Sequence, residues 1–248
     1  MSTDAREKQK QTAAKAAASF IRDKMTLGIG TGSTVYYLIK EIGTFRTTGI
    51  NVRAVVTSES SRELAISCGI SVCLPEEVDH IDLAIDGVDE IDGSFYAVKG
   101  GGGALLREKI VAYKADDVIW IMDESKLVER LGRFPLPAEV LPFAHTWAAE
   151  RIEELGGKAR LRERNGKIYD TDNGNYILDV TFPPGITYHT AADKIRQIPG
   201  VLETGYFNPV CSRIIVGTDS GAKEIVNQRQ SRKQPRDESK CDMTGKQV

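Results

Sequence analysis

The sequence has few of the residues that cross-link small secreted proteins or build compact metal sites. None of its four cysteines forms a Cys-x-x-Cys pair, and four in 248 residues do not make a disulfide framework. Its three histidines are widely spaced and predict no histidine-based metal site. No uncharged apolar run approaches the roughly 20 residues that a membrane span needs. An apolar signal-peptide segment is also lacking, so the sequence predicts a cytoplasmic protein.

A strong charge imbalance is absent as well. Lysine and arginine number 33 against 35 aspartates and glutamates, a net charge of −2. Such a balance predicts neither nucleic acid nor an anionic membrane as a partner, although a local basic site for a small anion remains open. The chain is 41% hydrophobic and 27% charged, which is typical of a soluble globular protein with one large domain or two small ones.

Strands and helices alternate in the first half of the chain. The predicted strands are residues 24–30, 51–57, 81–85, 95–98 and 118–122, and the predicted helices are residues 4–22, 33–42, 60–68 and 104–115. Because these strands are apolar throughout, they predict a parallel sheet that is covered on both faces.

The second half follows a different pattern after a proline-containing connector. Its elements run β-α-β-β-α-β, the order of a small ferredoxin-like domain, with strands at residues 138–141, 159–162, 176–181 and 201–207 and helices at residues 144–155 and 191–198. A last strand at 214–217 is expected to return to the first sheet. The predicted organisation is a catalytic domain of residues 1–130 with 208–226, a small α+β domain of residues 131–207, and a polar tail of residues 227–248, which we expect to be flexible.

Four unusual segments follow predicted strands, at residues 30–34, 86–89, 99–103 and 123–126. Ligands gather at the carboxyl ends of strands in an open parallel sheet, so we expect these segments to meet. The first matches neither the dinucleotide fingerprint nor the P-loop. Its glycines, its backbone amides and the hydroxyls of Thr31, Ser33 and Thr34 suit a phosphate at a helix N-terminus. A capped helix after a glycine turn explains it equally well.

The next two segments combine carboxylates, a lysine and glycines. Asp86 and Asp89 flank a predicted turn. There they could bind sugar hydroxyls, transfer protons or hold a divalent cation. Alternatively, their side chains only cap backbone groups of the turn. Lys99 precedes four glycines, a run that costs backbone entropy and makes sense where the backbone approaches a ligand. Lys126, in the fourth segment, is a candidate for holding a phosphate or an oxyanion, and otherwise a surface lysine.

Glu108 lies one turn into the helix predicted after the glycines. Leu105, Leu106, Ile110 and Val111 are expected to face the core, which leaves Glu108 on the less apolar side. A carboxylate beside a glycine-rich cavity suits a general base, whereas spacing alone favours an exposed glutamate.

Together these segments resemble the A-type ribose-5-phosphate isomerases. The matching stretches, in order, are GIGTGSTVYYLI, TSESSRELA, DLAIDGVDEID, KGGGGALLREKIVA, DESKLV, LGRFPLPAEV and TDNGNYILDV. The resemblance implies a Rossmann-like large domain with a smaller α+β domain, and a homodimer or homotetramer. It also implies reversible conversion of D-ribose 5-phosphate to D-ribulose 5-phosphate in the non-oxidative pentose phosphate pathway, with no metal or organic cofactor.

The resemblance further implies roles for individual residues. Glu108 becomes the proton acceptor, Lys99 the cation for the enediolate oxygen, and Asp86 and Asp89 the groups that open the sugar ring and pass protons. Lys10, in the first helix, aligns with a phosphate-contacting lysine. The implied substrate-binding positions are Thr31, Gly32, Ser33, Thr34, Asp86, Gly87, Val88, Asp89, Lys99, Gly100, Gly101, Gly102 and Lys126.

Other functions are compatible with a related architecture. They are a non-catalytic sugar-phosphate sensor, an amino-sugar phosphate deaminase and a CoA transferase. The N-terminus shows no helix-turn-helix module of a regulator, and each proposed catalytic position is filled, so the isomerase is favoured.

Overall fold

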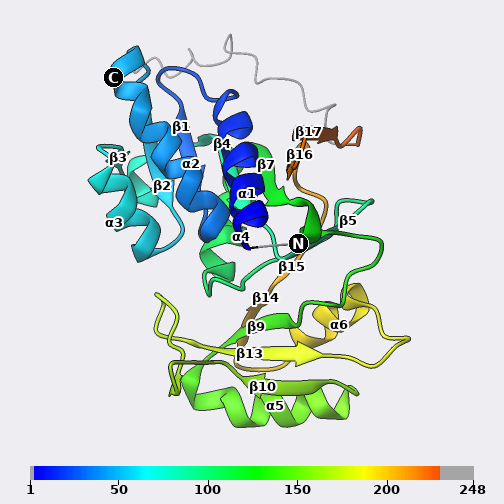
Figure 1. The fold of residues 1–248 in the computed structure, drawn as a ribbon. Coiled ribbons are helices and arrows are strands. Elements are labelled where there is room, and N and C mark those ends of the chain that lie inside the picture. Colours follow the sequence, from blue (N-terminus) through cyan, green and yellow to red (C-terminus); the bar gives the residue numbers. More distant parts are fainter. Residues whose placement is uncertain (1–2, 230–248) are drawn as a thin grey trace, which may run out of the picture.

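The computed structural model describes residues 3–229, which form two main layers built on separate sheets (Figure 1). Residues 230–248, most of the predicted tail, lie outside the described residues. The larger sheet and its helices lie above the smaller sheet in Figure 1. None of the helices in residues 3–229 is long and apolar enough to cross a membrane.

The larger sheet has seven strands in the order β17-β16-β7-β4-β1-β2-β3. All neighbouring pairs are parallel except β16 with β17, which confirms the predicted mostly parallel sheet and the return of the last predicted strand to it. Its strands are β1 (Thr26–Ile29), β2 (Arg53–Val56), β3 (Ser71–Val72), β4 (Ile81–Gly87), β7 (Ala115–Asp123), β16 (Arg213–Thr218) and β17 (Gly221–Val226). The strand predicted at 95–98 does not join this sheet and forms antiparallel pairs in a separate one.

Helices cover both faces of this sheet because its central strands are apolar on both sides. On β4, Leu83 and Ile85 pack in one core with the helices that precede them in the chain, whereas Ala84 packs in another core with the helix that follows. The first core is covered by α1 (Thr3–Ala18), α2 (Ser33–Gly43) and α3 (Glu59–Ser67), and the second by α4 (Leu105–Lys114).

The smaller sheet is antiparallel, in the order β10-β13-β9-β14, and has its own core. It confirms the predicted β-α-β-β-α-β order. Its elements are β9 (Leu136–Val140), α5 (His145–Glu154), β10 (Lys158–Leu161), β13 (Tyr176–Thr181), α6 (Tyr188–Ile195) and β14 (Val201–Thr204). An unpredicted hairpin of β11 (Glu163–Arg164) and β12 (Lys167–Ile168) projects between β10 and β13.

Short elements join the two layers. A further sheet in the order β15-β6-β5-β8 consists of β5 (Glu90–Asp92), β6 (Ala97–Val98), β8 (Leu127–Val128) and β15 (Tyr206–Phe207). The short 3₁₀ helices are η1 (Thr44–Thr48), η2 (Pro75–Glu77), η3 (Glu124–Lys126) and η4 (Pro142–Ala144).

The strand predicted at 201–207 is divided at Gly205 between two sheets. Its first part is β14 of the smaller sheet, and its second part, β15, pairs with β6. At the division the Lys99 N–H donates to the Gly205 C=O at 2.8 Å. A Cβ on Gly205 would overlap the Lys99 carbonyl, so this contact requires a glycine.

Several predicted element ends were wrong, each for a local reason. Helix α1 ends at Ala18 rather than at residue 22. The next residue, Ser19, donates its hydroxyl to the Ala16 C=O at 2.7 Å. Helix α6 begins at Tyr188 rather than at residue 191, because the Thr187 side chain caps it by accepting from the Thr190 N–H.

The predicted face of α4 was also partly wrong. Ile110 was expected in the core but is 59% exposed, whereas Glu108, which the spacing placed on the exposed side, is 4% exposed. The buried face runs instead through Leu105, Glu108, Val111 and Ala112, three or four residues apart. The helix is therefore rotated so that its one acidic residue faces inward.

Two matched substitutions test this orientation. Leu105→Ala is expected to lower the free energy of unfolding by about 2–5 kcal/mol, because Leu105 is fully buried. Ile110→Ala, a similar deletion on the same helix, should change it by less than about 0.5 kcal/mol. Urea unfolding measures both, and an equal loss in the two variants would contradict the orientation of α4.

Candidate active site

The four segments singled out from the sequence meet in one pocket of about 180 Å³. They follow β1, β4, β6 and β7, and three of these strands are parallel neighbours in the larger sheet. Of the predicted residues, Asp86 lies behind the wall, and those lining the pocket are Thr31, Gly32, Ser33, Thr34, Gly87, Val88, Asp89, Lys99, Gly100, Gly101, Gly102, Glu108 and Lys126.

Positive charges and a helix N-terminus both contribute to this lining. Helix α2 begins at Ser33, and its N-cap residue, Gly32, has no side chain to accept from the first amides of the helix. Such amides bind anions readily. Lys10 and Lys126 line the same pocket, together with Arg6, which the sequence analysis missed. Arg6 lies four residues before Lys10 on α1, and this helical spacing is the pattern that would have indicated it.

The Thr31 hydroxyl differs from the expectation that it points at the ligand. It hydrogen bonds with the hydroxyls of Thr57 and Ser58, each at 2.8 Å, and the Thr31 N–H donates to Asp86 Oδ1 at 3.1 Å. Thr31 therefore ties the β1–α2 loop to its neighbours. A Cβ on Gly30, just before it, would overlap the Asp86 carboxyl, which explains a glycine there.

Lys99 is the centre of a buried charge cluster. Its Nζ donates to Asp86 Oδ2 at 2.8 Å and to the Gly87 carbonyl, and lies 3.3 Å from Glu108 Oε2. The three charged residues are at most 4% exposed. Lys99 Nζ also lies over the Trp120 ring, 4.9 Å from its centre. One ammonium thus faces two carboxyl groups in a site largely closed to water.

The two carboxyl groups differ in how well their charge is stabilised. Asp86 accepts hydrogen bonds from Thr31, Gly87 and Lys99, whereas Glu108 Oε2 has no hydrogen-bond partner among the described residues. Burial raises the pKa of Glu108 to about 8, and the charge of Asp86 adds to the rise. Burial also raises the pKa of Asp86, although Lys99 opposes it. A proton shared by this pair is therefore best placed on Glu108.

Lys99 keeps its charge in this environment. Burial by itself would lower the pKa of Lys99, but the carboxylates of Asp86 and then Glu108 outweigh this effect, so the pKa is raised. The cluster therefore presents a permanent cation beside a carboxyl group that loses its proton near pH 8. A fixed cation next to a titratable carboxyl suits the removal of a proton from carbon beside a carbonyl.

The glycine loop after Lys99 lies against Asp89. The Gly101 N–H donates to Asp89 Oδ2 at 2.7 Å, and a Cβ on Gly101 would meet the same carboxylate. Gly100 and Gly103 have φ angles of 106° and 91°, which favour glycine. The run of glycines is thus explained by close approach and by backbone conformation.

The family was tested by comparison with known proteins. The model of the family described as Ribose 5-phosphate isomerase A (phosphoriboisomerase A) matches residues 53–221. The chain belongs to this family. Ribose-5-phosphate isomerase A of Bacillus mycoides is 45% identical over 216 residues, which cover 87% of this chain and 98% of that protein.

Solved structures of family members show the same fold. Ribose 5-phosphate isomerase from Plasmodium falciparum superposes with a TM-score of 0.85 at 33% identity, covering 90% of this chain and 99% of that one. A D-ribose-5-phosphate isomerase in complex with phospho-erythronic acid gives 0.85 at 39% identity with the same coverage. The expected family and the α/β fold class are therefore confirmed.

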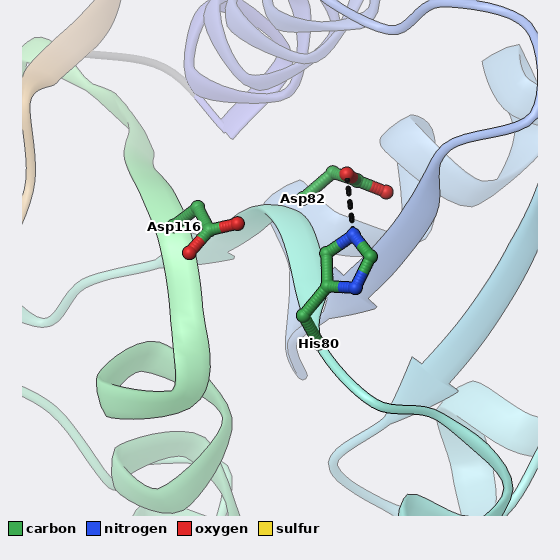
Figure 2. A group of neighbouring side chains, drawn as sticks. All are labelled: His80, Asp82 and Asp116. Atoms are coloured by element: carbon green, nitrogen blue, oxygen red, sulfur yellow. Dashed lines mark hydrogen bonds and ion pairs between the residues drawn. The ribbon is translucent and has the colours of Figure 1, made fainter. Parts of the chain in front are cut away.

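Another cluster in this ribose-5-phosphate isomerase A family member lies away from the pocket. His80, Asp82 and Asp116 come together at the start of β4 and β7, with possible ligand atoms within 4.8 Å of one another (Figure 2). The pocket lies at the other end of these strands, about 13 Å along β4. Asp82 already accepts from the Thr26 N–H at 2.6 Å and pairs with His80 at 3.0 Å, and these contacts account for its place.

The raised pKa of Glu108 has a consequence for stability. With a pKa of about 8 in the folded protein against an ordinary 4.5, the carboxyl holds its proton more tightly when folded. Its contribution is complete below pH 4.5 and is lost as the pH rises through 8. The melting temperature of Glu108→Gln minus that of the parent is therefore expected to increase as the pH rises from 5 to 8. Above pH 8 this difference should stay constant. Glu153→Gln, on an exposed face of α5, is the control. A gain that is the same at every pH would contradict the burial of an ionisable Glu108.

Proposed function

We propose that this protein interconverts D-ribose 5-phosphate and D-ribulose 5-phosphate. The observation that carries the proposal is the buried Glu108 carboxyl, which lines the pocket beside the Lys99 ammonium at 3.3 Å. An aldose and its ketose differ by the position of one hydrogen on adjacent carbons and one on their oxygens. A base on one side of the sugar and a cation at its oxygen are what this exchange requires.

The phosphate is proposed to bind at the start of α2. The residues at this helix start, Ser33 and Thr34, line the same pocket as Lys10 and Lys126. Anchoring this dianion fixes the far end of the substrate and lets binding energy position the carbons that react. The curated relatives named ribose-5-phosphate isomerase A support this choice of substrate.

The proposed chemistry divides between three groups. Asp89, which lines the pocket, assists opening of the sugar ring and passes the proton between O2 and O1, whereas Asp86, expected to share this role, lies behind the wall and holds Lys99 in place. The Glu108 carboxylate removes the proton from C2 and returns it to C1 on the same face. The Lys99 ammonium stabilises the negative oxygen of the enediolate in between, from a position fixed by Asp86 at 2.8 Å. These steps use side chains of this chain and need no metal or organic cofactor.

The backbone of the pocket wall has a supporting role in this proposal. Gly87 and Val88, between the two aspartates, and Gly100 to Gly102 bring main-chain groups against the substrate. Residues 1–130 with 208–226 would form the catalytic domain and residues 131–207 the small α+β domain. This division follows the larger and smaller sheets, with their separate cores.

The assembly and location are proposed on similar grounds. A homodimer or homotetramer would cover the exposed aromatic pair Phe143 and Trp147, which are 83% and 61% exposed and stack edge to face. We place the protein in the cytoplasm, in the non-oxidative pentose phosphate pathway. A reducing compartment agrees with the free cysteines Cys68, Cys73 and Cys211. Neither nucleic acid nor a membrane is proposed as a partner.

Turnover without added metal is the direct test of the activity. The purified protein with ribose 5-phosphate and EDTA is expected to form the ketose, followed by its absorbance or by a coupled assay. Glucosamine 6-phosphate is the control substrate, and release of ammonia from it would indicate a deaminase. Binding of ribose 5-phosphate without ketose formation would indicate a sensor and contradict the proposal.

Loss of the base should affect turnover more than binding. Glu108→Gln is expected to lower kcat by at least about 10²-fold with little change in KM, because a positioned base contributes about 10²–10⁴-fold. In the parent, kcat/KM should rise with pH through about 8, since Glu108 must lose its proton to act as the base. Near-normal turnover of the variant would remove Glu108 from this role.

A further inference from the structure

The glycine loop after Lys99 has no side chains with which to hold its own conformation. Residues 100–103 line the pocket or support it, and a run of glycines has many accessible backbone states. One hydrogen bond lies within the loop, from the Gly103 N–H to the Gly100 C=O at 3.0 Å, and the loop's other contacts come from groups elsewhere in the chain. Asp89 supplies one such group, through the Gly101 N–H. The loop carbonyls are held by residues that the sequence analysis did not single out.

Arg162, just after β10 in the smaller sheet, holds two of these carbonyls. Its Nε donates to Asp179 Oδ2 at 2.9 Å and its Nη2 to Asp179 Oδ1, a bidentate pair that fixes the plane of the guanidinium. The remaining nitrogen, Nη1, donates to the Gly100 C=O at 2.6 Å and approaches the Gly101 C=O at 3.4 Å. The Arg162 side chain is 11% exposed, so these bonds are mostly shielded from water.

Tyr169 adds a contact on the next carbonyl. Its hydroxyl donates to the Gly102 C=O at 3.2 Å, and its N–H donates to the Arg162 C=O at 2.9 Å. Arg162 and Tyr169 therefore face each other at the base of the β11–β12 hairpin. A Cβ on Gly103 would overlap the Tyr169 ring, so the loop and the hairpin are fitted to one another.

We infer that Arg162 is a positioning residue for the reaction, acting through the glycine loop with Tyr169 as its partner. The contacts hold three consecutive carbonyls toward the smaller sheet, while Asp89 holds the Gly101 amide from the other side. Lys99 precedes the loop directly, so a shift of Gly100 moves the ammonium relative to the substrate. A misplacement of about 1 Å costs up to about 10²-fold in rate. The inference rests on the proposed isomerase function.

Removal of the guanidinium tests the inference by steady-state kinetics with ribose 5-phosphate. Arg162→Ala is expected to lower kcat about 10- to 100-fold and to leave KM within about threefold, because the proposed phosphate site on α2 is untouched. Guanidinium chloride at millimolar concentration should restore at least about fivefold of the lost kcat, with sodium chloride at equal ionic strength as the blank. Arg160→Ala is the matched control, because Arg160 is exposed on β10 two residues before Arg162 and is paired in register with Asp179. It should keep the parent's kcat within twofold.

Turnover by the parent tests the proposed function, and the difference between the parent and Arg162→Ala tests this inference. If the parent turns over and Arg162→Ala stays within twofold of it, the inference is wrong. A loss that guanidinium does not restore in a folded variant overturns it as well. Should Arg162→Ala fail to fold, Arg162→Lys replaces it. A single ammonium cannot pair with both oxygens of Asp179 and also reach the loop, so its kcat is expected to be at least about fivefold lower than that of the parent. A kcat equal to that of the parent overturns the inference.

Discussion

The attraction between the buried Lys99 ammonium and the carboxyl groups of Asp86 and Glu108 determines how the pocket is built. Taking these charges out of water is costly and is tolerated where the geometry and added hydrogen bonds compensate. Asp86 therefore accepts three hydrogen bonds, and Gly30 has no side chain because that carboxyl fills the space. Two carboxyl groups against one ammonium leave an excess negative charge. Burial, and then the charge of Asp86, raise the pKa of Glu108 to about 8, so that a proton on Glu108 relieves this excess.

The same requirement explains the distribution of glycines. Main chain must come within reach of a small ligand while buried ionic groups keep their partners, and a Cβ would interfere at Gly30 and Gly101. Beyond the hydrogen bond between Gly103 and Gly100, the contacts that hold the loop come from outside it. Asp89 supplies one within the larger layer, and Arg162 with Tyr169 supplies others from the smaller one. The smaller sheet, which contains none of the predicted catalytic residues, is thereby connected to the catalytic end of the pocket.

Much of this site could be predicted from the sequence because parallel topology brings strand ends together. Segments 30–34, 86–89 and 123–126 meet because β1, β4 and β7 are neighbours in the parallel sheet. Segment 99–103 follows β6 of the short antiparallel sheet, so parallel topology does not account for its place. The burial of Glu108 could not be predicted, since the rotation of α4 depends on what packs beneath it, and Ile110 was misplaced for the same reason. Arg162 was also missed. Its contacts span about 60 residues of sequence, and nothing in its own neighbourhood marks it.

The division of one strand between two sheets at Gly205 has a mechanical consequence. The chain leaves β14, pairs with the main chain of Lys99 and continues into β15 without a loop between. Lys109, beside Glu108 on α4, also donates to the carbonyls of Thr204 and Tyr206, both at 2.7 Å. A displacement of the smaller sheet would thus be passed on both to Lys99 and to helix α4, which bears Glu108. A displacement of the segment around Gly205 would therefore reach the base and the cation together, because the same stretch of chain is bonded to both elements that bear them.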